Sequence, residues 1–335
     1  MKKNILIIGA AGYVGSVVTA HFLKSGFNVN VLDQFVYENE FTTSPFIGDP
    51  NYKLFKGDLG DSKILDECSK NVDQVFLLGG LVGDPITKNY PEESGFVNEN
   101  QVLRCIDYFD NKKIEKLVFI STCSNYGLIN ENELADEEFD LNPLSLYAKA
   151  KVLAEKHLLS KKGKTKYSGV VLRFATAFGL SPRMRFDLTV NEFTRDLFFK
   201  EELVVFDEHT WRPYCHVRDF ARLLEIIYNS DNNKIHFEIF NAGGDKNNFT
   251  KKMILDCITK NIDDCKIMFN QNDSDPRNYR VSFKKVKEQL GFEPLYSVEH
   301  GIEELIEALK MGLFSDSLTN KNKYGNYKIN FSLKG

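Results

Sequence analysis

Short apolar runs alternate with longer amphipathic stretches along the first 175 residues of the chain. The runs that predict strands are Asn4–Ile8, Asn28–Leu32, Lys53–Phe55, Gln74–Leu78, Leu117–Ser121 and Gly169–Phe174. They are continuously apolar, which is typical of parallel strands that helices cover on both faces. The stretches between them predict helices at Val14–Lys24, Lys63–Lys70, Asn98–Phe109 and Leu146–Leu159. This order predicts an α/β fold, a Rossmann-type doubly wound parallel sheet.

The alternation becomes irregular after about residue 178. Helices are predicted at Val190–Phe199, Val217–Asn229, Thr250–Asn261, Phe283–Leu290 and Val298–Met311, and strands at Leu203–Phe206 and near Phe237–Phe240. This half is expected to add a smaller α/β C-terminal lobe. In the first half, residues 35–52 have the composition of a loop, and their length suggests a functional role.

The composition narrows the class of protein without giving a function. The 335 residues carry a formal net charge of −4, are 42% hydrophobic and include 27 Phe and 14 Tyr. We expect about two domains with a large apolar core, which excludes an intrinsically disordered chain. The mild acidic balance argues against a dedicated nucleic-acid binder, because such proteins need a positive field.

Six scattered cysteines, with no C-x-x-C pair, predict neither a metal site nor a disulfide framework. Free thiols of this kind favour a cytoplasmic location, where the compartment is reducing. No apolar run approaches the roughly 18 residues of a membrane span, so no membrane association is expected.

A glycine-rich turn joins the first predicted strand to the first predicted helix. Gly9, Gly12 and Gly15 form a G-x-x-G-x-x-G pattern, with Tyr13 and Val14 inside it. Such a turn lets the backbone approach a pyrophosphate, which the helix N-terminus then stabilises. The second strand ends at Asp33, whose carboxylate can accept hydrogen bonds from ribose hydroxyls. No arginine follows Asp33 to neutralise a 2′-phosphate, so NAD is favoured over NADP.

Two further turns fit the same cofactor. Asp58 and Leu59 follow the third strand, where Asp58 is expected near the adenine. Leu78, Gly79 and Gly80 follow the fourth strand and are expected to pass close to the pyrophosphate or the nicotinamide ribose. Each of these turns alone is compatible with a purely structural role.

Tyr147 and Lys151 are candidate catalytic residues because their i, i+4 spacing places both on one face of a helix. A neighbouring ammonium lowers the pKa of a phenol, which makes the tyrosine a plausible general base. The fifth strand ends at Thr122, so its hydroxyl lies at the edge of the sheet where ligands bind in open α/β folds. Thr122, Ser124 and Asn125 in this segment are also candidate substrate contacts.

Together these motifs resemble those of the extended short-chain dehydrogenase/reductases. Within that group the sequence is similar to the NAD-dependent epimerase/dehydratase family, which acts on nucleotide-activated sugars. The resemblance implies that Thr122, Tyr147 and Lys151 are the catalytic Thr, Tyr and Lys. The sugar 4,6-dehydratases of the family have Asp-Glu after that Thr, where this chain has Cys123 and Ser124. Dehydration is therefore not expected.

The resemblance also implies a substrate site in the second half of the chain. Arg212 matches an Arg that contacts the substrate diphosphate, a role that suits the guanidinium fork. Arg183, Arg185 and Asn191 lie where relatives hold the nucleotide, although both arginines are also compatible with structural ion pairs. A further phosphate-binding Arg is either Arg277 or Arg280. His216 precedes a predicted helix and is expected to be structural.

The Ser181–Arg185 run is similar to a branch that includes nucleotide-sugar 4-epimerases and GDP-heptose 4-dehydrogenases of surface-polysaccharide pathways. That resemblance implies NAD-dependent oxidation at C4 of a UDP- or GDP-linked sugar, with epimerase and net dehydrogenase or reductase both open. The alternatives are a dehydratase and a catalytically silent NAD-binding sensor or scaffold. The intact Thr122, Tyr147 and Lys151 count against a silent protein.

These arguments divide the chain by expected role. Residues 1–178 are expected to be the NAD-binding domain that carries the catalytic groups, and residues 179–312 mainly the substrate lobe. Residues 313–335 are rich in Asn and Lys and are expected to be a solvated tail, with a nucleotide- or partner-binding arm as the alternative. Family resemblance also implies a homodimer, formed through the helices at Asn98–Phe109 and Leu146–Leu159.

Overall fold

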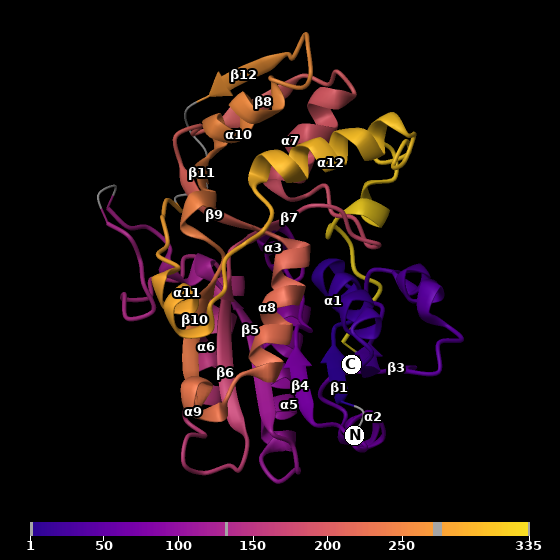
Figure 1. The fold of residues 1–335 in the computed structure, drawn as a ribbon. Coiled ribbons are helices and arrows are strands. Elements are labelled where there is room, and N and C mark those ends of the chain that lie inside the picture. Colours follow the sequence, from indigo (N-terminus) through magenta and orange to yellow (C-terminus); the bar gives the residue numbers. More distant parts are fainter. Residues whose placement is uncertain (1–2, 131–132, 271–276, 334–335) are drawn as a thin grey trace.

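A seven-stranded parallel sheet forms the centre of the molecule (Figure 1). The computed structural model describes residues 3–130, 133–270 and 277–333. In spatial order the strands are β10 (Glu238–Ala242), β6 (Ser168–Phe174), β5 (Lys116–Thr122), β4 (Gln74–Leu77), β1 (Asn4–Ile8), β2 (Asn28–Asp33) and β3 (Tyr52–Lys56), each parallel to its neighbours. The predicted α/β doubly wound sheet is confirmed, and β1 to β6 lie where the apolar runs predicted them.

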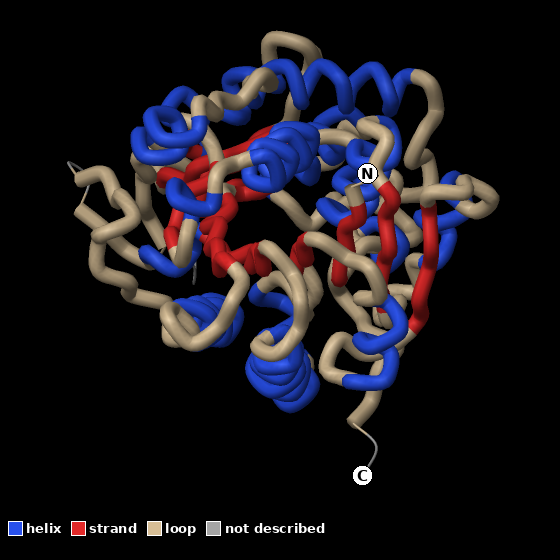
Figure 2. Tube along the Cα trace, turned by 60° about the horizontal axis from the view of Figure 1, so that its bottom comes forward, coloured by secondary structure: helices blue, strands red, loops and turns tan. Residues whose placement is uncertain are grey.

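Helices cover both faces of this sheet, as Figure 2 shows. On one face, Ile5 and Ile7 pack with side chains from α1 (Tyr13–Lys24), α8 (Val217–Asn229) and α11 (Lys284–Leu290). On the other face, Leu6 and Ile8 pack with side chains from α2 (Ser62–Cys68), α5 (Val102–Phe109) and α6 (Leu146–Leu159). Alternate residues of one strand therefore serve two apolar layers, which explains the uninterrupted apolar runs in the sequence.

The second lobe holds two small sheets and three long helices. β7 (Thr176–Phe178), β9 (Trp211–His216) and β11 (Asn248–Thr250) form one sheet, and β8 (Leu203–Phe206) pairs with β12 (Ile267–Asn270). α7 (Thr189–Phe198), α10 (Lys251–Ile258) and α12 (Val298–Lys310) share a core with them. The sequence predicted β8 and these helices but missed β7, β9, β11 and β12. Those strands are short or mixed in polarity, and pairing partners from distant parts of the chain decide their conformation.

Part of the second half of the chain belongs to the central sheet and to one of the helical layers that cover it. β10 pairs with β6 at the edge of the large sheet, and α8 packs on the same face as α1. The short helix α9 (Asn232–Ile235) connects α8 to β10 and buries Ile235 in that layer. The division at residue 178 by function remains a prediction, whereas the sheet itself draws on residues from both sides of it.

Some local structure differs from the sequence prediction. The helix predicted at Asn98–Phe109 starts as a π-helical segment, Phe96–Gln101, before α5 begins. The loop predicted at residues 35–52 contains a 3₁₀ helix, Glu40–Phe46, and two short helices, α3 (Asp84–Asn89) and α4 (Pro91–Gly95), were not predicted. No helix in the described part of the chain is long and apolar enough to cross a membrane.

The described residues beyond 312 are not solvated throughout, because a few of them are buried although many are exposed. A segment at residues 324–331, here called the C-terminal strap, runs from the end of α12 back past α1 toward β1 and β3 (Figure 1). Tyr324 and Asn326 are buried, and the Phe331 ring stacks on Phe96 with ring centroids 6.2 Å apart. The polar composition hid these contacts, because a few apolar side chains with distant partners are enough to hold an extended segment.

Candidate active site

A cavity of about 860 Å³ opens at the carboxyl ends of the central strands. The strand order reverses there, between β1 and β4, and open α/β sheets bind their ligands at such a point. The predicted site residues that line it are Gly9, Gly12, Tyr13, Val14, Gly15, Asp33, Leu59, Leu78, Gly79, Gly80, Thr122, Ser124, Tyr147, Lys151, Arg183, Arg185, Arg212 and Arg277. Its volume is within the usual range for small-molecule sites.

The turn after β1 can be built only with glycine at two of its positions. Gly9 has φ +86°, and a Cβ on it would lie 2.6 Å from the backbone nitrogen of Gly79. A Cβ on Gly15 would lie 2.2 Å from the carbonyl oxygen of Gly9, so α1 reaches the strand only because that side chain is absent. Gly12 caps α1 without a side chain and lines the cavity. The backbone N–H groups at this helix end are therefore accessible to an anion.

Asp33 closes the same end of the cavity. Its carboxylate accepts hydrogen bonds from the backbone N–H groups of Ala11, at 2.9 Å, and Phe35, at 2.8 Å. Burial raises the pKa of Asp33, while those two bonds oppose the rise. A carboxylate accepts about four hydrogen bonds, so Asp33 retains acceptor capacity toward ribose hydroxyls.

The turns after β3 and β4 contribute unequally. Leu59, Leu78, Gly79 and Gly80 line the cavity. Asp58 is not among the lining residues, because its carboxylate accepts hydrogen bonds from Gln101, at 2.9 Å, and from the backbone of Gly60, at 2.7 Å. Asp58 thus shapes the turn that presents Leu59.

The three predicted catalytic residues meet at one wall. Ser145 caps α6 by accepting a hydrogen bond from the backbone of Ala148, which fixes the helix that carries Tyr147 and Lys151. The Lys151 ammonium is buried, donates to the carbonyl of Ile120 at 2.7 Å and lies 5.8 Å from the centroid of the Tyr147 ring. Burial lowers the pKa of Lys151 to about 8. Thr122 follows Ile120 at the end of β5, so one lysine contacts both the strand and the tyrosine.

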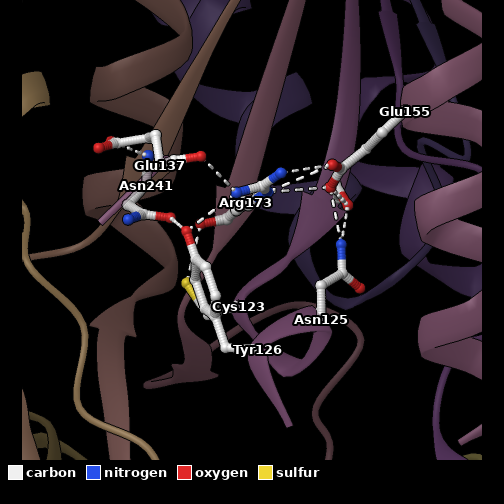
Figure 3. Close-up of polar contacts among 8 residues, drawn as sticks. Cys123, Asn125, Tyr126, Glu137, Glu155, Arg173 and Asn241 are labelled. Atoms are coloured by element: carbon white, nitrogen blue, oxygen red, sulfur yellow. Dashed lines mark hydrogen bonds and ion pairs between the residues drawn. The ribbon is translucent and has the colours of Figure 1, made fainter. Parts of the chain in front are cut away.

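A buried polar network lies behind this wall (Figure 3). Glu155, one helical turn after Lys151 on α6, forms an ion pair with Arg173 of β6 at 2.9 Å. Glu155 also accepts hydrogen bonds from Asn125, at 2.7 Å, and from Ser121, the residue before Thr122. Asn125 therefore belongs to this network and not to the cavity lining. The network joins α6 to the ends of β5 and β6, and so holds Thr122, Tyr147 and Lys151 in register.

Basic and aromatic side chains line the second-lobe side of the cavity. The Arg212 guanidinium lies 5.0 Å from the centroid of the Tyr279 ring, and the Tyr279 hydroxyl is 3.1 Å from that of Ser124. Arg277 lines the cavity as well, whereas Arg280 lies over the Trp211 ring and is not among the lining residues. The geometry therefore favours Arg277 for the position that the sequence left undecided.

Three other predicted residues are held by partners within the protein. Arg185 forms a buried ion pair with Asp187 at 2.6 Å. The Asn191 amide donates to the Tyr13 hydroxyl, at 3.0 Å, and to the carbonyl of Arg185, so Asn191 supports the wall without lining it. His216 is fully buried and pairs with Glu304 at 3.0 Å, consistent with a structural role.

Some residues of the cavity were missed by sequence reasoning. Lys251, the first residue of α10, lines the second-lobe side. Asn39 lines the cofactor side from the segment predicted as a loop, and Asn326 reaches it from the C-terminal strap. Nothing in the local sequence singles these residues out, because each is brought to the cavity by contacts with distant segments.

An adenine dinucleotide fits the cofactor side on the evidence of unpartnered atoms. Asn39 Oδ1, Arg183 Nε and Asn326 Oδ1 are among the buried side-chain atoms of the lining that have no hydrogen-bond partner in the described part of the chain. A buried polar atom without a partner is destabilising, so such atoms point to a ligand. Ribose hydroxyls can donate to the two oxygens, and diphosphate oxygens can accept from Arg183 and from the turn at Gly12.

The sequence matches one family model over most of its length. The NAD dependent epimerase/dehydratase family matches residues 5–243. A dTDP-glucose 4,6-dehydratase from Streptomyces niveus is 25% identical over 319 residues, which cover 91% of this chain and 92% of that protein. A UDP-glucose 4-epimerase from Corynebacterium glutamicum is 24% identical over 337 residues, which cover 96% of this chain and 99% of that protein.

Solved structures show the same fold. A dTDP-glucose 4,6-dehydratase from Bacillus anthracis, in complex with NAD, superposes with a TM-score of 0.81 at 20% identity and covers 93% of this chain and 97% of its own. A UDP-glucose 4-epimerase from Thermotoga maritima, with UDP-glucose, gives a TM-score of 0.80 at 24% identity, over 92% of this chain and 99% of its own. At these identities the likeness establishes the fold alone.

Proposed function

The chain belongs to the NAD-dependent epimerase/dehydratase family, and on that premise we propose that it oxidises C4 of a nucleotide-activated sugar. Its cofactor is NAD, which accepts a hydride from the carbinol carbon when bound. One observation carries the proposal. Thr122, Tyr147 and Lys151 line the same cavity as the glycine turn, so proton removal and cofactor binding share one site.

The side chains have distinct roles in this proposal. The Tyr147 phenol takes the proton of the C4 hydroxyl as a general base. Lys151, held by the carbonyl of Ile120, places a positive charge beside Tyr147 and so stabilises its phenolate. The Thr122 hydroxyl forms a hydrogen bond with the same sugar oxygen and orients it toward Tyr147. Thr122 and Lys151 are buried, whereas Tyr147 is partly exposed toward the cavity, where it can meet the sugar.

The nucleotide diphosphate is assigned to the second-lobe side. Arg212, Arg277 and Lys251 all line that side and supply positive charge for phosphate oxygens. The Tyr279 ring, packed under Arg212, presents an aromatic surface beside them. These groups recognise a diphosphate in either a UDP- or a GDP-linked sugar, so the nucleotide base is left to experiment.

A dehydratase is the second candidate, since relatives with that activity share the family. The residue after Thr122 is Cys123, which is buried and donates a hydrogen bond to the carbonyl of Arg173 at 3.1 Å. Burial raises its pKa well above the usual range, so it is a poor proton donor to a sugar. Ser124 contacts the Tyr279 hydroxyl and carries no acid. These observations favour redox chemistry at C4 without loss of water.

The test mixes the purified, NAD-loaded protein with a panel of UDP- and GDP-sugars. Conversion to a 4-epimer without a net change in absorbance at 340 nm identifies an epimerase. A net rise in absorbance at 340 nm identifies a dehydrogenase. A 4-keto-6-deoxy product would show a dehydratase and contradict the proposal of redox chemistry at C4 without loss of water. No conversion of any nucleotide sugar, with NAD still bound, would support the silent sensor or scaffold.

The cellular setting and assembly extend this proposal. All six cysteines are free thiols, which suits a reducing cytoplasm where sugars for surface polysaccharides are made. Leu146 and Leu153 on α6 are exposed apolar residues, consistent with a homodimer through α5 and α6. Light scattering after size-exclusion chromatography checks the dimer, and Leu153→Glu should yield a monomer.

A further inference from the structure

The C-terminal strap connects the second-lobe side of the cavity to its cofactor side. At one end, the backbone N–H of Phe186 donates to the carbonyl of Tyr324 at 2.7 Å, and the N–H of Asn326 donates to the Asp187 carboxylate at 3.1 Å. At the other end, the N–H of Asn330 donates to the carbonyl of Val36 at 2.7 Å. The strap therefore spans the cavity next to the segment that follows Asp33.

Arg183 is the charged group that the strap contacts. The side chain is 1% exposed, its Nη2 donates to the carbonyl of Gly325 at 3.0 Å, and its guanidinium lies 5.0 Å from the Tyr37 ring. Among the described residues no carboxylate forms an ion pair with it, and burial together with the charge of Arg185 lowers its pKa to about 10. Asp187, which is paired with Arg185, and Asp33 act on Arg183 only at longer range. A buried cation without an ion-pair partner of its own indicates a site for an anion that the protein does not supply.

Asn326 presents a hydrogen-bond acceptor in addition to this cation. Its amide nitrogen donates to the carbonyl of Val82 at 2.9 Å, which fixes the orientation of the amide and leaves Oδ1 buried without a donor. Asn39 has the same arrangement, because its amide nitrogen donates to the carbonyl of Ala11 at 2.7 Å and its Oδ1 has no partner. One cation and two acceptors are therefore left for a ligand that carries both phosphate and hydroxyl groups.

We propose that the C-terminal strap is part of the dinucleotide site. In this proposal the Gly325 carbonyl orients Arg183 toward the cofactor diphosphate, and Asn326 accepts a hydrogen bond from a hydroxyl of the adenosine half. The adenosine half is chosen because the strap is bonded to Val36, three residues after Asp33. The inference rests on NAD as the cofactor and is independent of the sugar.

The experiment measures cofactor binding by protein stripped of cofactor. Calorimetric titration with NAD and with ADP-ribose should show binding about tenfold weaker for Asn326→Ala and on the order of 10–100-fold weaker for Arg183→Gln. Both variants should lose the same factor with ADP-ribose as with NAD, because the strap faces the adenosine half. Stopped-flow fluorescence should show NADH leaving Asn326→Ala faster than wild type.

Ser332→Ala is the matched control. Ser332 directly follows the strap, and its side chain is exposed and outside the cavity lining. Its NAD affinity should stay within about twofold of wild type. Thermal denaturation of each apo variant checks the fold, and Arg183→Lys, which keeps the charge, is measured in the same way if Arg183→Gln unfolds.

Two outcomes would overturn the proposal. If Asn326→Ala and the Arg183 variants bind NAD and ADP-ribose with wild-type affinity, the strap has only a structural role. If these variants lose affinity for the nucleotide sugar but retain affinity for NAD, the strap belongs to the substrate site and not to the cofactor site. If the variants lose NAD but the wild type converts no nucleotide sugar, the strap assignment stands and the proposed reaction fails.

Discussion

Two walls of the same cavity satisfy their buried polar groups in opposite ways. At the catalytic wall, Glu155 is paired with Arg173, and the Lys151 ammonium is bonded to the carbonyl of Ile120. At the strap wall, Arg183 has no carboxylate partner among the described residues, and Asn326 Oδ1 has no donor. The protein pairs the charged groups of one wall by itself and leaves those of the other unpaired, although Asn125 Oδ1 behind the catalytic wall also lacks a partner among the described residues.

The difference separates two tasks of an active site. A paired network fixes the proposed catalytic side chains before any ligand arrives, so their orientation does not have to be established during the reaction. Unpaired groups are destabilising until a ligand supplies their partners, so they contribute to affinity. We therefore expect substitutions at the catalytic wall to affect turnover and folding, and substitutions at the strap wall to affect cofactor retention.

The sharpest test of this contrast is Tyr147→Phe. Removal of the general base should lower kcat on the order of 10³-fold, while the affinity for NAD stays near that of wild type. Nucleotide-sugar turnover and NAD titration measure the two quantities. Tyr108→Phe, which removes a hydroxyl bonded to Asp66 on the surface, should change neither. If Tyr147→Phe lost NAD affinity by a factor similar to its loss of kcat, the two walls would not have separate roles.

Arg173→Met tests whether the paired network supports folding. The change leaves Glu155 buried without its partner, which should reduce the free energy of unfolding by about 3–5 kcal/mol. Adding Glu155→Gln should restore a large part of that loss, because the uncompensated charge is gone. Urea denaturation of the two variants measures both effects. A double variant as unstable as Arg173→Met alone would contradict the charge argument.

The pH dependence of turnover tests the role of Lys151. Its pKa of about 8 means that the ammonium loses its proton as the pH rises above that value. Support for the Tyr147 phenolate is then lost, so kcat/KM should fall about tenfold per pH unit on the alkaline side. Lys151→Arg, which stays charged, should move this decline to higher pH. A wild-type profile that is flat to pH 10 would exclude the lysine from this role.

The smallest effect concerns Glu192 on α7, close to Tyr327 of the strap. Burial, followed by the charge of Asp196, raises the pKa of Glu192 to about 7. The folded chain therefore binds more protons than the unfolded chain between about pH 4.5 and 7, and stability falls as the pH rises through that window. Glu192→Gln should gain roughly 1–2 kcal/mol relative to wild type between pH 5 and 8.

Thermal denaturation at both pH values measures this difference. The exposed Glu288→Gln serves as the control and should show no such gain. If the stability of Glu192→Gln depends on pH as that of wild type does, Glu192 does not titrate in this pH range.

A helix or strand can be predicted from the sequence more readily when other elements cover it on both faces. Strands β1 and β5 are covered on both faces, so their apolar runs marked them without knowledge of their partners. Strand β9 carries Arg212 and Pro213 and pairs with short strands that lie distant in the chain, and it was missed. The strap was missed for the same reason, because Ile329 and Phe331 have partners about 230 to 290 residues earlier, and Tyr324 packs on Phe186.

The site divides in a similar way. The glycines and the pair Tyr147 and Lys151 lie on the cavity because their chemistry and spacing admit few other arrangements. Asp58, Asn125 and Asn191 are turned toward protein partners instead of the cavity. A short polar side chain serves a turn, a network or a ligand equally well, and only the three-dimensional neighbours decide among these.

The pairing of β10 with β6 has a consequence for dissecting the chain. A fragment that ends at residue 178 would lack the strand at residues 238–242 and would expose the outer edge of β6 to solvent. It would also uncover the face of α1 that α8 protects. Unpaired edges and bare apolar faces promote aggregation. Truncation at this point would thus yield an insoluble product instead of a minimal nucleotide-binding module, and the two halves must be expressed together.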